Sequence, residues 1–234
     1  ICDKGWTKKV NINKVNHVNN GVDLAEFERN RQLYTLENSQ IANDDAFKVV
    51  YMGSIRKVNN LQTLVDAARE LKNENVHFYI YGDGTEKDML EEQCRKQALN
   101  VKFEGRVEKK YIPYILSQSD LNIINVQGAG INRYGCSWNK LFEYMASKKP
   151  ILCNLPIEHD LIRERKLGVA KKFKTAKEYA QEIIVFKNMS DKDYKNYCDR
   201  LEKTAKEYDY QTLSDKIEFI MKKAVNISKN KNLS

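Results

Sequence analysis

The chain has 234 residues, of which 41% are hydrophobic and 10% aromatic, a composition that supports a buried core and excludes wholesale disorder. No apolar run approaches the ~18 residues of a membrane span, and no charged-then-apolar leader is seen at the start. Lys and Arg number 40 against 32 Asp and Glu, so the formal net charge is +8. This excess favours an anionic partner, such as a nucleotide, a nucleic acid or an anionic membrane, without choosing among them.

The cysteines indicate a reducing environment. There are five, an odd number, and none forms a C-x-x-C pair. They fall inside apolar or helical stretches, which predicts reduced thiols in a cytosolic protein and not a disulfide framework or a zinc site.

From residue 47 onward, short β-branched or aromatic runs alternate with helical hydrophobic spacing. The predicted strands are residues 47–53, 76–81, 101–103, 121–126, 150–155 and 169–173. The intervening helices are expected at 61–71, 111–119, 138–147 and 161–166, with a charged helix after residue 84 that places Leu90, Cys94 and Ala98 on one face. Three more helices, near 176–187, 191–208 and 213–224, follow without strands.

This alternation predicts an α/β domain with a doubly wound parallel sheet, Rossmann-like, followed by C-terminal helices. The pattern defines the secondary structure of the first forty-odd residues less clearly. Residues 16–20 could form a strand leading to Gly21, and residues 24–36 a helix.

In such a sheet the ligand crevice lies beyond the carboxyl ends of the strands. Gly53 and Ser54 stand at the first strand end, and Arg56 and Lys57 follow as cations that could hold a diphosphate. The alternative is an ordinary glycine-containing turn with solvated basic residues. After the second strand, residues 82–84 are interpreted as an ordinary turn in preference to a binding segment. After the third strand, residues 105–107 could be a ligand-binding loop or simply the end of the strand with an exposed Arg106.

The block 134–146 is the most informative. Ser137 is a plausible N-cap, which would leave the amides of Trp138, Asn139 and Lys140 free at a helix start. Free amides, the helix dipole and a lysine together form an anion site. Glu143 lies one turn further in, where a carboxylate could accept hydrogen bonds from vicinal ribose hydroxyls. The alternative is an amphipathic helix with a capping serine and an exposed Lys/Glu pair.

No metal site is expected. The D-x-D spacing of 191–193 follows Ser190, which favours helix capping, and the three histidines, His17, His77 and His159, lie far apart. His77 falls in a strand and is expected to be packed. The lysine-rich stretches 171–177 and 222–231 are interpreted as solvated faces, with peripheral attachment to anionic lipid as the minority alternative.

The order of these segments resembles the C-terminal, donor-binding half of GT-B glycosyltransferases of glycosyltransferase family 4, especially bacterial members that assemble capsule, O-antigen or other surface polysaccharides. The resemblance spans residue 15 to the last helix. It is carried by the segments 20–23 (NGVD), 53, 60–64, 82–84 (GDG), 103–107 (FEGRV), 134–146 and 149–151.

The resemblance implies a role for each matching position. The helix after Ser137 would hold the diphosphate through its first amides, Asn139 and the Lys140 side chain, and Glu143 would take the ribose hydroxyls. The Arg106–Val107 backbone would meet the base edge, and Gly53, Ser54, Arg56 and Lys57 would face the phosphates.

Three departures from the family pattern stand out. Many members carry a glutamate where this chain has Gly135, so recognition of the donor sugar must differ. The usual Arg after the first-loop glycine is Ser54, and the usual Lys further along is Asn59. The residue after the capping serine, often Pro, is Trp138, which is expected at the first helical position and could stack on a ligand.

The resemblance also implies a domain organisation. Residues 1–46 would be an interdomain segment and the start of the domain, and 47–208 the nucleotide-sugar-binding domain. Residues 209–234 would be a helix crossing back to an absent N-terminal acceptor domain, plus a tail. Part of the apolar face of that helix, with Leu213, Ile217, Ile220 and Met221, is then expected to be exposed.

The implied activity is transfer of a sugar from a nucleoside diphosphate sugar, expected to be a UDP-sugar, to a saccharide or polyprenyl-linked acceptor. The reaction would retain configuration and use no metal or cofactor, in the cytoplasm or at the inner face of the membrane. Alternatives are a non-catalytic nucleotide-sugar-binding subunit and a GT-B-fold UDP-sugar epimerase. A nucleic-acid binder is disfavoured, because no aromatic residues interleave with the basic ones.

Overall fold

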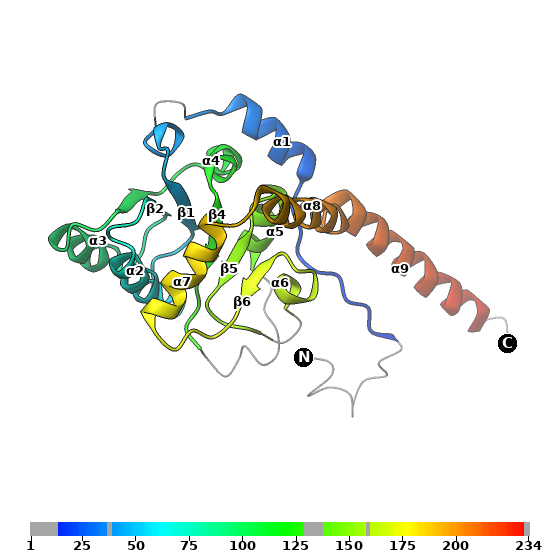
Figure 1. Ribbon diagram of the computed structural model, residues 1–234. Coiled ribbons are helices and arrows are strands. Elements are labelled where there is room, and N and C mark those ends of the chain that lie inside the picture. Colours follow the sequence, from blue (N-terminus) through cyan, green and yellow to red (C-terminus); the bar gives the residue numbers. More distant parts are fainter. Residues whose placement is uncertain (1–13, 37–38, 129–137, 158–159, 232–234) are drawn as a thin grey trace.

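The computed structural model describes residues 14–36, 39–128, 138–157 and 160–231. Within these ranges a parallel sheet of six strands has the order β3-β2-β1-β4-β5-β6 (Figure 1). The chain adds strands toward one side of the sheet from β1 to β3 and toward the other side from β4 to β6. The boundary between β1 and β4 is therefore the topological switch point of a doubly wound fold. The strands are β1 (Phe47–Met52), β2 (Val76–Tyr81), β3 (Val101–Gly105), β4 (Leu121–Ile124), β5 (Ile151–Cys153) and β6 (Gly168–Ala170).

Helices connect these strands and continue after the last one. The α-helices are α1 (Leu24–Leu33), α2 (Leu61–Glu70), α3 (Lys87–Lys96), α4 (Ile112–Gln118), α5 (Asn139–Ala146), α6 (Leu161–Glu164), α7 (Ala176–Lys187), α8 (Asp191–Glu207) and α9 (Tyr210–Lys231). Short 3-10 turns are η3 (Ile41–Asn43), η4 (Lys57–Asn59) and η5 (Lys109–Tyr111).

Two hydrophobic cores, one on each face of the sheet, explain why the strands read as nearly continuous apolar runs. Along β1, Val50 and Met52 enter the core made with α4, α5 and α8, while Val49 and Tyr51 enter the core made with α2, α3 and α7. Because neighbouring strand residues point to opposite faces, a strand covered on both sides must be apolar throughout. The doubly wound prediction is confirmed.

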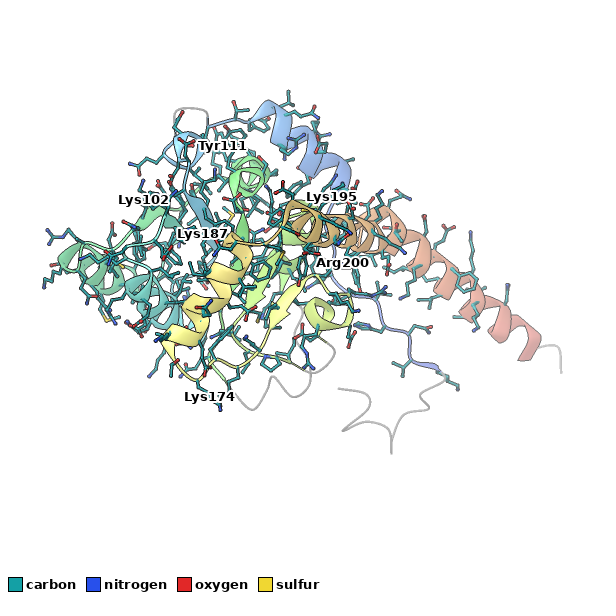
Figure 2. The ribbon with its side chains drawn as sticks, in the orientation of Figure 1. Lys102, Tyr111, Lys174, Lys187, Lys195 and Arg200 are labelled. Atoms are coloured by element: carbon teal, nitrogen blue, oxygen red, sulfur yellow. The ribbon has the colours of Figure 1, made fainter. Side chains whose placement is uncertain are left out.

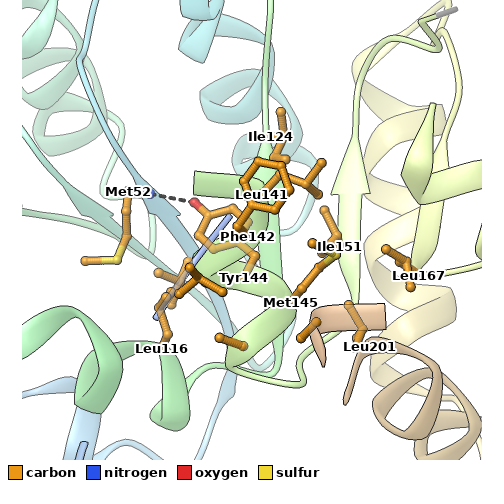
Figure 3. Close-up of a cluster of buried hydrophobic side chains, with 14 of the residues drawn as sticks. Met52, Leu116, Ile124, Leu141, Phe142, Tyr144, Met145, Ile151, Leu167 and Leu201 are labelled. Atoms are coloured by element: carbon orange, nitrogen blue, oxygen red, sulfur yellow. Dashed lines mark hydrogen bonds between the residues drawn. The ribbon is translucent and has the colours of Figure 1, made fainter. Parts of the chain in front are cut away.

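Tyr144 fixes the position of α5 on the sheet. Its buried hydroxyl accepts a hydrogen bond from the Met52 amide at 2.9 Å (Figure 3). It also donates one to the Ile123 carbonyl at 3.2 Å. Leu141, Phe142 and Met145 pack around it in the same core. The helix is therefore tied both to β1 and to β4, which holds its first turn near the end of β1.

Some local predictions were wrong. Residues 16–20 form no strand; only Val22 makes an isolated bridge, to Asp209. Ala98 was expected in a helix, on one face with Leu90 and Cys94, but α3 ends before it and Ala98 is exposed with φ of 50°. Ser190 caps α8 as expected, since its hydroxyl accepts from the Asp193 amide at 3.2 Å.

The cysteines in the described ranges form no disulfide: Cys94 and Cys153 are buried and Cys198 is half-buried. Cys2 and Cys136 lie outside the described residues, as does His159. Helix α9 projects away from the body of the fold (Figure 1) and carries the exposed apolar side chains Ile217, Phe219, Met221 and Val225. No helix in the described part of the chain combines the length and apolar character needed to cross a membrane.

Basic side chains are spread widely over the surface. The labelled lysines and arginine of Figure 2 come from β3, the segment before α7, α7 and α8, and they lie in separate places. In the stretch 171–177 all four lysines are exposed, which confirms the interpretation as a solvated face. Of the stretch 222–231, the side chains described, up to residue 226, are exposed as well.

Candidate functional site at the carboxyl edge of the sheet

The loops that leave β1, β2 and β3 lie against one another at the carboxyl edge. The Gly53 amide donates to the Tyr81 carbonyl at 2.9 Å, and the Gly82 amide donates to the Gly105 carbonyl at 2.7 Å. A Cβ on Gly82 would lie 1.8 Å from the Gly53 carbonyl oxygen, so no other residue fits there. Residues 82–84, predicted to be an ordinary turn, thus also allow the loops after β1 and β2 to pack closely.

Helix α5, which the sequence analysis predicted to start an anion site, begins one residue later than expected. Trp138 is the N-cap, with extended φ of −90° and ψ of 122°, and no side chain caps the helix there. Asn139 and Lys140 therefore contribute the first amides, which have no acceptor within the helix. The expectation that Trp138 is the first helical residue is wrong. The predicted cap Ser137 and the departure at Gly135 lie outside the described residues.

The side chain of Lys140 reaches from α5 across the end of β1. Its Nζ lies 3.2 Å from the Tyr51 hydroxyl and 4.3 Å from the centroid of the Tyr51 ring. A Cβ on Gly53 would be 2.6 Å from Nζ, so the glycine at this strand end leaves room for the lysine. Burial lowers the pKa of Lys140 to about 8, against the opposing influence of Glu143 and Cys153.

Glu143 lies one turn along α5 and lines a cavity of about 190 Å³. Burial raises the pKa of its carboxyl, and the positive charges of Lys109 and Lys140 oppose this effect. Asn139 lines the same cavity and accepts a hydrogen bond from Asn20 Nδ2 at 3.0 Å. The other lining residues come from 21–23, α1, the 109–113 segment and α9: Gly21, Val22, Asp23, Glu26, Phe27, Asn30, Lys109, Lys110, Ile112, Pro113 and Tyr210.

The remaining predicted site residues are more peripheral. Ser54, Arg56 and Lys57 are exposed around the start of η4, where Asn59 Nδ2 donates to the Ser54 carbonyl at 2.7 Å. The exposed Arg106 pairs with Asp83 of the neighbouring loop at 3.4 Å. Val107 is half-buried and packs against the core that contains α4 and α5.

The structure thus brings together two pairs of predicted residues: Gly53 with Lys140, and Asn139 with Glu143. Lys109 and Tyr51 were not predicted as site residues. Lys109 lies four residues after the end of β3, and this position beyond a strand end could have marked it as a candidate. Tyr51 reads as an ordinary core residue inside a strand, and nothing local marks its contact with Lys140. Within the described ranges, no three His, Cys, Asp or Glu side chains gather closely enough to hold a metal ion.

The doubly wound parallel sheet, with a half-buried lysine and glutamate at its carboxyl edge, defines a Rossmann-like α/β domain. The chain belongs to the family described as glycosyl transferases group 1, whose model matches residues 35–208. This confirms the resemblance to GT-B glycosyltransferases; the narrower assignment to family 4 and to surface-polysaccharide enzymes stays a prediction. Comparison with curated proteins yields no match.

Solved structures of glycosyltransferases share the fold at low sequence identity. A Rickettsia africae glycosyltransferase has a TM-score of 0.74 at 15% identity, over 94% of this chain and 60% of that one. Anabaena HepE, in complex with UDP and glucose, has a TM-score of 0.66 at 18% identity, over 88% and 56%. The C-terminal domain of Francisella tularensis LpcC has a TM-score of 0.62 at 20% identity, over 81% and 100%. The chain thus spans a little over half the length of HepE.

Proposed function

We propose that this chain is the donor-binding part of a glycosyltransferase that takes a sugar from a nucleoside diphosphate sugar. The observation that carries the proposal is the position of Lys140 Nζ, enclosed against Gly53 at the start of α5, with Glu143 one turn behind it in a cavity. Burial destabilises the charged form of a lysine, and an anionic ligand bound beside it stabilises that form again. A diphosphate at this turn would provide one.

In the proposed complex each group has a separate task. The diphosphate lies between the 53–57 loop and the first amides of α5, where Lys140 neutralises its charge and Arg56 or Lys57 can add to it. Glu143 accepts hydrogen bonds from the ribose hydroxyls, and the Arg106–Val107 backbone meets the base edge. Stabilising the departing diphosphate lowers the barrier to breaking its bond to the sugar, which develops positive charge. We propose that these cations serve in place of a metal ion and that the reaction retains configuration.

UDP is the proposed nucleotide. HepE is described in complex with UDP and glucose, and the pneumococcal O-GlcNAc transferase GtfA with UDP and GlcNAc. The two share the nucleotide but differ in the sugar, so they support the nucleotide and leave the sugar of this chain open.

The proposal includes a second domain that binds the acceptor. The chain covers 56% of HepE but all of the LpcC C-terminal domain, as a donor-binding half would. The apolar side chains exposed on α9, with Met221 63% exposed, would be covered by that second domain. We propose a saccharide or polyprenyl-linked acceptor in surface-polysaccharide synthesis, in the cytoplasm or peripherally at the inner membrane face.

Calorimetric titration of the chain with UDP, GDP and ADP tests the nucleotide proposal. UDP is expected to bind, and at a hundredfold excess over its dissociation constant to add about 2.7 kcal/mol to the free energy of unfolding. GDP and ADP serve as controls of equal charge. The chain alone is expected to bind without transferring sugar. Absence of binding by all three nucleotides at millimolar concentration would contradict the proposal.

A further inference from the structure

Tyr51 and Lys140 meet although they belong to opposite layers of the fold. Tyr51 is fully buried in β1, and its ring packs in the core on the α2, α3 and α7 face. Lys140 comes from α5, which covers the other face. The contact is possible only because the lysine side chain passes over the end of β1, where Gly53 has no Cβ to block it.

The hydrogen bonds of the Tyr51 hydroxyl have defined directions. The hydroxyl donates to the Ser54 carbonyl at 2.8 Å. Since an ammonium group can only donate, the phenol oxygen must accept from Lys140 at 3.2 Å. One phenol therefore joins the lysine to the loop that follows β1, and its ring offers the ammonium a π face at 4.3 Å.

Tyr51 is the closest polar partner that the described residues offer to this ammonium. Glu143 and Cys153 act on Lys140 through their charge, whereas the hydroxyl of Tyr51 lies within hydrogen-bonding distance of Nζ. Burial also raises the pKa of Tyr51, so the phenol keeps its proton and stays a neutral acceptor across the range in which the lysine titrates.

We propose that Tyr51 is a positioning residue for Lys140: its hydroxyl and ring hold the ammonium beside Gly53, where the diphosphate of the donor binds. The inference rests on the proposed function and deepens it. Without the hydroxyl, Nζ loses its acceptor and rotates more freely on its four-carbon stem, so less of the population is ready to meet a phosphate oxygen.

The test compares Tyr51→Phe with Tyr79→Phe in the full chain. Tyr79 is a matched control, because it is also a fully buried tyrosine, on the adjacent strand β2, whose hydroxyl bonds to Asp44 and not to the site. Calorimetry measures UDP affinity at pH 7 and then from pH 6.5 to 9.5, and thermal unfolding without UDP measures the stability of each variant.

Tyr51→Phe is expected to weaken UDP binding about tenfold at pH 7, the effect of one hydrogen bond to a charged group. Its affinity is also expected to fall with rising pH at a lower midpoint than in the unsubstituted chain, because the lost phenol oxygen favoured the charged lysine. Tyr79→Phe should lose stability yet keep both the affinity and the midpoint.

If Tyr51→Phe binds UDP as Tyr79→Phe does, with the same affinity and pH midpoint, the positioning role is wrong while the proposed function stands. If the unsubstituted chain binds none of UDP, GDP and ADP, the proposed function fails, and the inference that rests on it fails as well.

Discussion

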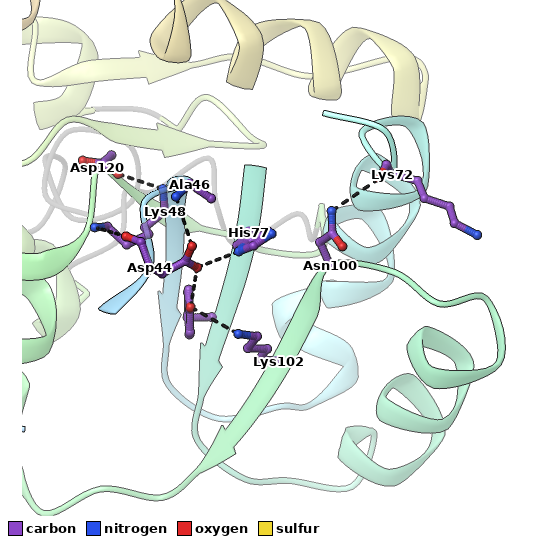
Figure 4. Close-up of polar contacts among 9 residues, drawn as sticks. Asp44, Ala46, Lys48, Lys72, His77, Asn100, Lys102 and Asp120 are labelled. Carbon is purple, nitrogen blue, oxygen red and sulfur yellow. Dashed lines mark hydrogen bonds and ion pairs between the residues drawn. The ribbon is translucent and has the colours of Figure 1, made fainter. Parts of the chain in front are cut away.

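The amino and carboxyl edges of the sheet, where the strands begin and end, differ in how their buried charges are compensated. At the amino edge, Asp44 accepts hydrogen bonds from the Ala46 amide at 3.0 Å and from the Tyr79 hydroxyl at 2.5 Å, and pairs with His77 at 2.6 Å (Figure 4). Burial alone would raise the pKa of Asp44, but these partners outweigh it and the pKa is lowered. Here the protein itself satisfies its charge.

At the carboxyl edge, the protein leaves its charges undersatisfied. Lys140 and Glu143 are both enclosed by the fold, and for both the first influence is burial, which lowers the pKa of the lysine and raises that of the glutamate. Burying charge without full compensation destabilises the folded state, and such sites cluster where ligands bind. Asp44 therefore belongs to a structural network, whereas Lys140 and Glu143 have the character of a binding site, and substitutions at the two places should have opposite effects.

The largest effect is expected from Lys140→Met. UDP affinity should fall about a hundredfold, because a charge-assisted contact to the diphosphate is lost. Stability at pH 7 should not fall and should rise by about 1 kcal/mol, since the cost of the buried ammonium is fully present below pH 8 and disappears as pH rises past 10.5. Calorimetry and thermal unfolding measure the two quantities.

Lys195→Met provides the control for charge alone, because Lys195 is an exposed α8 residue paired with Asp199 at 3.2 Å. It should bind UDP as the unsubstituted chain does. Equal losses of affinity in both variants would mean that UDP responds only to net charge.

Asp44→Asn should show the reverse pattern at the amino edge. We expect a loss of about 2 kcal/mol in the free energy of unfolding, because the buried Tyr79 hydroxyl and the half-buried His77 lose a charged acceptor. UDP affinity should not change. The exposed neighbour Asp45, changed to Asn, should leave both quantities unaltered. Denaturant unfolding checks stability; a weakened UDP affinity in Asp44→Asn would undo the comparison.

The pH dependence of UDP binding sharpens the role assigned to Lys140. Its pKa of about 8 means that the ammonium form declines above that value, so affinity should be about tenfold weaker at pH 9 than at pH 7. Lys140→Met should flatten this dependence. An affinity that is constant from pH 7 to 9 in the unsubstituted chain would argue against contact between the lysine and the phosphates.

A smaller effect is expected from Glu143→Gln, which keeps the shape of the side chain but weakens it as an acceptor for the ribose hydroxyls. UDP affinity should fall about fivefold. Because burial raises the pKa of Glu143, the carboxylate costs stability above that pKa and nothing below 4.5. The variant should therefore be more stable than the parent at pH 7 and equal to it at pH 4. Glu202→Gln removes a half-buried carboxylate on α8 whose pKa is lowered by its pairing with Lys148, so this control should bind UDP as the parent does and should not gain stability at pH 7.

The sequence predicted the parts of the fold that depend on local pattern. All six strands fall within the predicted runs; β1, β2, β4 and β5 are largely buried on both faces, whereas β3 has no fully buried residue. Helix α7 begins and ends where its spacing predicts. The start of α5 was misplaced by one residue, because cap preference favours serine while packing of Leu141 and Tyr144 sets the helix register.

The contacts that build the site were less accessible. Lys140 meets Tyr51 over 89 positions in sequence, and Asn139 meets Asn20 over 119. No periodicity reports contacts of this kind, because they depend on which strands become neighbours and how far one long side chain reaches. The resemblance to a family pointed to α5, and the geometry added Tyr51 in contact with Lys140 and Lys109 in the cavity that Glu143 lines.

The most direct test of the account is a crystal structure of the chain soaked with UDP. We predict phosphate oxygens within hydrogen-bonding distance of Lys140 Nζ and of the first amides of α5, with the ribose hydroxyls on Glu143. A nucleotide bound elsewhere, with its phosphates away from Lys140 and Gly53, would contradict the central claim.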